Sequence, residues 1–167
     1  MELLELKDKT LAIFNASDVS SLGQKLLECV QKEDINKYNE FLSLIENDLS
    51  TDWLQMIYQY YEADRIEKKQ DYTPKSLAIL CAKLCCDDDC IDLCSGSGAL
   101  TIQKWNINKN IHFELYEYDE NVLLYLIFNM VIRNIDCNIY HSDVLQDEIY
   151  KTIIIEKGEK FGVAKWV

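Results

Sequence analysis

The chain has 167 residues, of which 49% are hydrophobic and 28% charged, which is ordinary for a globular protein with one core or one core plus a helical extension. Its longest apolar run, Val122 to Phe128, is far shorter than the roughly 20 residues of a membrane span, and its first residues lack the basic start of a signal peptide. We therefore expect no membrane segment and a cytoplasmic location. The net charge of −12, with Arg65 and Arg133 as the only arginines, argues against this chain alone binding a nucleic acid backbone.

Residues 1–69 are predicted to form a helical N-terminal region. From about Ser20, two segments place apolar residues at helical spacing, and these residues are Leu22, Leu26, Leu27 and Val30, then Ile35, Tyr38, Phe41, Leu42 and Ile45. Asp34 is the predicted N-cap of the second helix, and Ser50 or Thr51 that of a third helix over 50–69. We expect a small bundle that packs on the following domain, with a separate binding module as the alternative.

The only proline of the chain, Pro74, marks the start of the next predicted helix. A proline suits the first turn of a helix, where its missing N–H has no partner in any case, and it favours an extended Thr73 before it. The expected buried face of this helix has helical spacing and consists of Leu77, Leu80, Cys81 and Leu84.

Five of the seven cysteines fall between Cys81 and Cys94. A metal site is one interpretation of four of them, which are Cys81, Cys85, Cys86 and Cys90, although their spacing lacks the CxxC pairs typical of zinc sites. Buried reduced thiols at helical spacing explain the same residues more simply, so we predict no metal.

From Cys90 onward the sequence alternates between strand and helix patterns. The predicted strands are CIDLCSG, IHFELYEYD and CNIYHSDV, and the predicted helices are ALTIQKW and NVLLYLIFNMVIRN. This order predicts an α/β fold whose strands run parallel and are joined by helical crossovers. The last 17 residues, from Lys151 to Val167, predict a β-hairpin with a turn at EKGEK.

The loop after the first predicted strand contains Ser95, Gly96, Ser97 and Gly98. Glycines at a strand-to-helix junction let a ligand approach the backbone closely, and the N–H groups of the next helix then face it. Similar loops join strands and helices in folds that bind nothing. The loop alone therefore leaves a nucleotide cradle and a simple connection both open.

Polar residues also end the second and third predicted strands. Glu117 follows Gly98 by 19 residues, where an acid of a doubly wound fold binds ribose hydroxyls. Tyr118 is positioned to lie against an adenine ring, and Asp143 to accept a hydrogen bond from its amino group. Because the carboxyl ends of parallel strands share one edge, these residues together predict a nucleoside site.

In combination these motifs resemble the adenine-N6 DNA methyltransferases that use S-adenosylmethionine, in the group that contains the modification subunits of type I restriction systems. The family carries a helical N-terminal region, then Q-x-[FY]-T-P and D-x-[CA]-x-G-[ST]-G, which stand here as QDYTP at Gln70 to Pro74 and DLCSGSG at Asp92 to Gly98. YEYD and SDV fit its ribose and adenine motifs. The resemblance covers roughly Tyr60 to Asp143 and implies an incomplete Rossmann-like methyltransferase domain over 70–167.

The resemblance implies a role in binding S-adenosylmethionine for ten residues. Tyr72, Thr73 and Pro74 would hold the methionine end, Ser95, Gly96 and Gly98 would surround the middle, Asp92 would order the loop or receive the amino group, Glu117 would hold the ribose, and Tyr118 and Asp143 would frame the adenine. Methyl transfer to DNA adenine is the implied activity.

The catalytic [DN]-P-P-[FYW] motif of the family is missing, because the sequence has a single proline. We therefore assign no catalytic residue. The chain is a fragment of a longer enzyme, a short protein that binds the cofactor, or a subunit completed by a partner, and DNA is a partner only of the completed enzyme. The first strand would form an open edge that favours a homodimer or hetero-oligomer, unless the C-terminal hairpin covers it. The alternative function is an inactive protein-interaction module, and a small-molecule or RNA methyltransferase is a weaker one.

Overall fold

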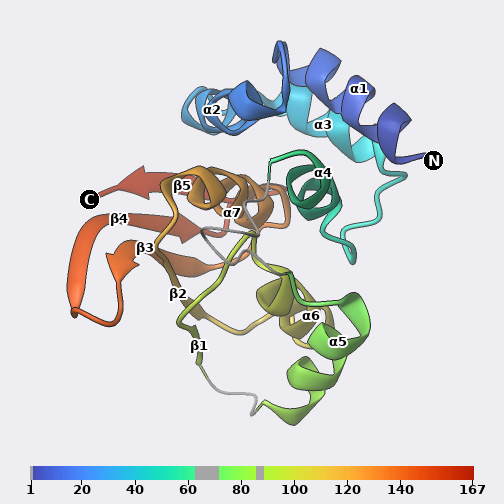
Figure 1. Cartoon of the computed structure of the whole chain (residues 1–167). Helices are drawn as coiled ribbons and strands as arrows, with labels where there is room; N and C mark the ends of the chain where they lie inside the picture. Colours follow the sequence, from blue (N-terminus) through green and yellow to red (C-terminus); the bar gives the residue numbers. More distant parts are fainter. Residues whose placement is uncertain (1, 63–71, 86–88) are drawn as a thin grey trace.

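The computed structural model describes residues 2–62, 72–85 and 89–167, and the following elements lie within these ranges. The helices are α1 (Leu3–Phe14), α2 (Val19–Gln31), α3 (Ile35–Leu44), α4 (Trp53–Tyr61), α5 (Lys75–Leu84), α6 (Ala99–Ile107) and α7 (Glu120–Ile132). The strands are β1 (Cys90–Asp92), β2 (Phe113–Glu117), β3 (Cys137–Asp143), β4 (Glu148–Glu156) and β5 (Val163–Trp166) (Figure 1). The predicted α/β class and the helical N-terminal region are confirmed. Predicted residues 63–69 of the third helix, Gln70 and Cys86 lie outside the described ranges.

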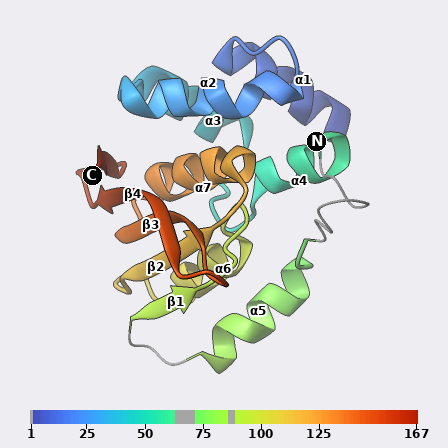
Figure 2. The same ribbon diagram turned by 60° about the vertical axis from the view of Figure 1, so that its left-hand side comes forward.

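The five strands form one mixed, open sheet in the order β1-β2-β3-β4-β5. β1, β2 and β3 are parallel, as the alternation of strands and helices predicted. The C-terminal hairpin is also confirmed, and β4 pairs antiparallel with β3. The hairpin therefore extends the sheet beyond β3 and leaves β1 at the opposite edge, so the alternative in which the hairpin covers β1 is wrong (Figure 2).

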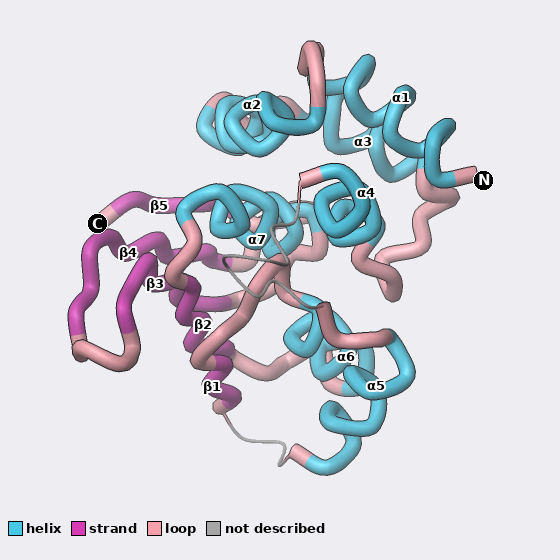
Figure 3. Tube along the Cα trace, in the orientation of Figure 1, coloured by secondary structure: helices cyan, strands magenta, loops and turns pink. Residues whose placement is uncertain are grey.

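The N-terminal helices form a layer over α7, as the tube in Figure 3 shows. α1 was not predicted, yet it buries Leu6, Thr10 and Phe14 at four-residue spacing. Asp34 caps α3, as predicted, by accepting a hydrogen bond from the Lys37 N–H at 3.2 Å. The cap of α4 is Asp52 instead of Ser50 or Thr51, and it accepts from the Gln55 N–H at 3.0 Å.

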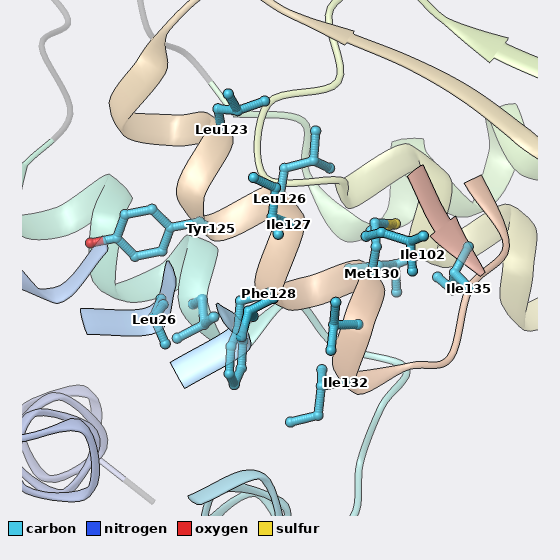
Figure 4. Packing of buried hydrophobic residues seen from close by; sticks show 14 of the residues in the cluster. Leu26, Ile102, Leu123, Tyr125, Leu126, Ile127, Phe128, Met130, Ile132 and Ile135 are labelled. Atoms are coloured by element: carbon cyan, nitrogen blue, oxygen red, sulfur yellow. The ribbon is translucent and has the colours of Figure 1, made fainter. Parts of the chain in front are cut away.

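Helix α7 is the centre of the hydrophobic core. It contacts α2 and α4 on one side and β2, β3 and β5 on the other, so it is buried nearly all round (Figure 4). The Phe128 ring makes edge contacts with Phe14 at 5.2 Å and Phe41 at 5.6 Å. The helical region thus packs on α7 and shares one continuous core with the rest of the domain, as expected of a bundle rather than a separate module. The predicted boundary at residue 69 stays a prediction.

The predicted buried face of α5 is wrong. Leu77, Leu80 and Leu84 are 48%, 52% and 75% exposed, whereas Ala78 and Ala82 are buried. α5 packs closely against α6, and the small alanine side chains allow this approach. The leucines consequently face outward, since the same helix cannot turn both stripes toward α6.

A buried polar network ties the N-terminal helices to the loop after β1. The Asp52 carboxylate accepts from Ser97 Oγ at 2.6 Å and from Asn129 Nδ2 at 2.9 Å, and the same Asn129 amide donates to the Ser97 carbonyl at 2.9 Å. Asp52, Ser97 and Asn129 are all buried. Buried polar groups need such partners, because each loses its bonds to water. The network therefore fixes the position of the loop relative to α4 and α7.

Arg133 extends this network toward the segment before α4. Its guanidinium donates to Asn129 Oδ1 at 2.8 Å and to the carbonyls of Leu49 at 3.0 Å and Thr51 at 2.8 Å. Burial lowers the pKa of Arg133 to about 10, and the negative charge of Asp52 opposes this shift. The arginine stays charged at neutral pH and balances the buried carboxylate.

We expect Asp52→Ala to lower the free energy of unfolding by about 3–5 kcal/mol, because it removes the negative charge that balances buried Arg133 and the acceptor of the Ser97 hydroxyl. Asp34→Ala is the matched control, since it removes only a helix cap and should cost about 1 kcal/mol. Urea unfolding of both variants measures the difference. Equal losses would show that Asp52 acts only as a cap.

Candidate functional site

The loop between β1 and α6 wraps closely around the end of β1. Ser95 N–H donates to the Tyr116 carbonyl at 2.9 Å, and Gly98 N–H donates to the Ser95 carbonyl at 2.8 Å. Gly96 and Gly98 have φ angles of 55° and 98°, in the left-handed region that favours glycine. Glycine suits both positions, because the backbone of any other residue would be strained at these φ angles.

Glu117 holds the loop from the end of β2. Its Oε2 accepts from the Gly96 N–H at 2.7 Å, and its Oε1 accepts from the Asp119 N–H at 2.7 Å. A carboxylate has about four lone-pair positions, so each oxygen keeps capacity for a further donor. Burial raises the pKa of Glu117, while the two backbone N–H groups oppose the shift.

The two glycines differ in their surroundings. A Cβ at Gly98 would lie 2.7 Å from Met130 Cε and 3.1 Å from Leu126 Cδ1, so Gly98 is needed for packing against α7. A Cβ at Gly96 would meet nothing within 4 Å. The space beside the Gly96 Cα is therefore open, in contrast to the packed surroundings of Gly98.

Glu117, Tyr118 and Asp143 line one cavity of about 350 Å³ at the carboxyl edge of the sheet. Its other lining residues are Leu93, Cys94, Ser142, Val144 and Leu145. Tyr118 is 66% exposed, and its ring is available to stack. Asp143 Oδ1 accepts from the Leu145 and Gln146 N–H groups at 3.0 and 3.2 Å. The volume falls within the range of about 300–1,000 Å³ typical of small-molecule sites.

A second, wider cavity of about 660 Å³ begins on the other side of Tyr118. It shares Glu117 and Tyr118 with the first cavity and is lined further by Asp119, Glu120, Asn121, His141 and Tyr150. The His141 ring hydrogen-bonds the Tyr118 carbonyl through Nε2 at 3.0 Å. Tyr118 thus separates two hollows that meet at the end of β2.

The residues predicted for the methionine end lie apart from the first cavity. Tyr72 packs edge-on against Tyr58, at 6.2 Å between ring centroids, and burial together with nearby negative groups, Glu117 among them, raises its pKa. Pro74 is the N-cap residue of α5, and its carbonyl accepts from the Leu77 N–H at 2.9 Å and the Ala78 N–H at 3.0 Å. Thr73 is half-buried between them.

Asp92 and Ser95 face the protein instead of the cavity. Asp92 Oδ1 accepts from the Cys94 N–H at 3.3 Å, and Ser95 Oγ donates to the Asp92 carbonyl at 3.0 Å. Burial raises the pKa of Asp92. These two residues order the loop, which is one of the two roles expected for Asp92.

The charged side chains that line the cavity are all acidic. Its ionisable lining residues are Glu117, Tyr118, Asp143 and the Cys94 thiol, and no lysine or arginine is among them. Burial and the nearby Glu117 and Asp92 raise the pKa of Cys94, which keeps the thiol neutral. The site therefore favours a neutral or cationic ligand over a phosphate.

Sequence analysis missed Asp52, Asn129 and Arg133, which support the loop through Ser97. A signal was present, because Asn129 and Arg133 are polar residues inside a segment that is otherwise apolar. Asp52 gave no such signal, since an acid before a helix is explained by capping alone.

The cysteines before the loop are free thiols of mixed exposure. Cys81 and Cys90 are half-buried and Cys85 is exposed, so the expectation that these thiols are buried is wrong for Cys85. Within residues 2–62, 72–85 and 89–167, no three His, Cys, Asp or Glu side chains are arranged to hold a metal ion. In the same ranges, none of the helices combines the length and apolar content needed to cross a membrane.

Comparisons with family models, with curated proteins and with solved structures each find no match to this chain. The resemblance drawn from the motifs therefore stays a prediction that rests on this chain's residues.

Alanine at the two glycines should separate packing from ligand access. We expect Gly98→Ala to lower the free energy of unfolding by about 2–4 kcal/mol, since it combines a positive φ with a clash against Met130. Gly96→Ala should cost only about 1–2 kcal/mol, because the added methyl group meets open space. Chemical unfolding of both variants gives the two values. A larger loss at Gly96 would contradict this assignment.

Proposed function

We propose that the chain binds S-adenosylmethionine at the carboxyl edge of β1, β2 and β3, as a methyltransferase-like domain of Rossmann type. The observation that carries this proposal is the arrangement of Glu117 between the open backbone of Gly96 and the cavity of Tyr118 and Asp143. Glu117 would accept from the ribose hydroxyls, Tyr118 would cover the adenine face, and Asp143 would accept from the adenine amino group.

The charge of the site selects among nucleoside ligands. S-adenosylmethionine carries a sulfonium and an ammonium group, whereas dinucleotides and nucleoside triphosphates carry phosphates. The cavity has carboxylates and no basic side chain, and the whole chain has a net charge of −12. A cationic nucleoside is attracted to such a site and a phosphate is repelled. This favours S-adenosylmethionine over a phosphate-bearing cofactor.

When bound, S-adenosylmethionine supplies an electrophilic methyl group. The chain's own residues would orient the cofactor, and Glu117 would hold both the ribose and the Gly96 backbone. The proposed reaction of the completed enzyme is methyl transfer to the N6 nitrogen of a DNA adenine. The single proline excludes the N-P-P motif from these 167 residues, so the group that activates the amine must come from another polypeptide segment.

An inactive interaction module is the second candidate. Two observations favour it, namely the missing catalytic motif and the net charge of −12, which suits a protein partner better than DNA. In that case the fold would be retained without chemistry, and cofactor binding separates the two candidates.

Calorimetric titration with S-adenosylmethionine and S-adenosylhomocysteine should give dissociation constants in the micromolar range. We expect Tyr118→Ala to weaken binding at least tenfold, because it removes an exposed stacking ring without disturbing the core. Tyr60→Ala is the matched control, since Tyr60 is equally exposed on α4 and far along the chain from the site. NAD should bind at least tenfold more weakly.

Two results would contradict the proposal. One is the absence of binding at millimolar S-adenosylmethionine by a chain shown to be folded, which would favour the interaction module. The other is an equal effect of the Tyr118 and Tyr60 substitutions.

Binding should weaken as the pH falls, starting above 4.5, the ordinary glutamate value. Burial raises the pKa of Glu117, so its carboxylate takes up a proton sooner than an exposed glutamate and loses its acceptor and its charge. Because the raised pKa belongs to the folded state, protonating Glu117 does not itself favour unfolding. Wild type and Tyr118→Ala are titrated with S-adenosylmethionine at a series of pH values, and circular dichroism checks folding at each pH. Both proteins should lose the same fraction of their affinity as the pH falls. Constant affinity down to pH 4.5 would exclude Glu117 as a ligand.

A further inference from the structure

An exposed apolar surface lies on α5 and the end of β1. Leu77, Leu80 and Leu84 form one stripe of α5, and Ile91 and Leu93 are 63% and 55% exposed. Helical residues at i, i+3 and i+7 share one face, so the stripe is continuous. Leucine side chains of this kind are usually buried in a core, yet here they are exposed within the described part of the chain.

A groove of about 310 Å³ lies between α5, β1 and α6, and the exposed Ile91 and Leu93 side chains line it. Its walls are mainly apolar and consist of Cys81, Ala82, Cys85, Cys90, Ile91, Asp92, Leu93, Leu100, Thr101 and Lys104. The Lys104 ammonium is buried and donates to the Cys85 carbonyl at 2.9 Å, so its charge does not face the groove freely. The groove therefore suits apolar side chains.

The backbone of β1 borders the same groove. Within the described part of the chain, β1 pairs only with β2 and is the edge strand of the sheet. Cys90 N–H donates to the His112 carbonyl of the β2 side at 3.1 Å. Because backbone groups alternate in direction along a strand, Ile91 turns its N–H and C=O away from β2 and toward the open edge. This geometry accepts a further strand.

An acidic side chain lies in the wall of this groove. Thr101 is only 2% exposed, and its hydroxyl interacts with the Asp92 carboxyl, which also accepts from the Cys94 N–H at 3.3 Å. Both residues line the groove. A basic side chain of an occupant would form an ion pair with the Asp92 carboxylate there.

We propose that this groove binds an extended strand of a different polypeptide, which pairs with the Ile91 backbone and carries apolar side chains and a basic residue opposite Asp92. Charge decides against a second copy. Pairing two β1 edges would bring the two Asp92 carboxylates together and join two chains of net charge −12 each. A strand with a lysine or arginine instead neutralises Asp92. The proposal does not depend on the cofactor.

The test uses the full chain and a display library of random twelve-residue peptides. We expect selection to recover peptides with alternating apolar residues and at least one basic residue. In the presence of a recovered peptide, exchange of the Ile91 amide hydrogen should slow at least tenfold, as measured by NMR. Recovery of no binders would overturn the proposal.

Variants locate the binding. Ile91→Ser with Leu93→Ser should weaken peptide binding at least tenfold without loss of folding, because both side chains line the groove and are exposed. Leu4→Ser is the matched control, since Leu4 is 58% exposed on α1. Ile91→Pro removes the outward N–H and spares the bonds to β2. Unchanged peptide binding by the Ile91→Ser, Leu93→Ser double variant would overturn the proposal. A dimer of the peptide-free chain that this double variant abolishes would overturn it too.

Discussion

The buried carboxylate of Asp52 is the constraint on which the site depends. A charge at that depth is stable only with several donors, and here they come from the loop after β1 and from α7. Arg133 balances the charge and binds the backbone before α4. The N-terminal helices, the loop and α7 are thereby joined in one network. Displacing any of them would leave a buried polar group without its partner.

Glu117 makes the second connection, between the loop and β2. Glu117 Oε2 holds the Gly96 N–H and its Oε1 holds the Asp119 N–H, and each oxygen keeps capacity for a further donor. Gly98, which looks equivalent in the sequence, serves the packing against α7. Gly96 therefore lies on the open side of the loop, and Gly98 lies on the side that packs against α7. Leu93 lines both the cavity of Glu117 and Tyr118 and the groove beside β1, so a strand bound in that groove would end next to this cavity.

The alternation of strands and helices and the cap at Asp34 were predictable, because they depend on local spacing and capping. The exposure of the α5 leucines was not, because helical spacing identifies a stripe and cannot say which stripe meets a neighbour. Ala78 and Ala82 face α6 because their small side chains let the two helices approach closely, and this packing is a tertiary effect. The sequence also placed Glu117, Tyr118 and Asp143 correctly at one edge, since parallel strands end together. The structural role of Asp52 was not predictable, because its partners Ser97 and Asn129 lie far along the chain.

The central claim is that an adenosine cofactor lies over Tyr118 beside Gly96. Isotope-edited NMR of the chain with S-adenosylmethionine tests it directly. The account predicts nuclear Overhauser effects between the adenine protons and the Tyr118 ring, together with a shift of the Gly96 amide. Contacts that map to the α5 groove or to no defined residues would contradict it.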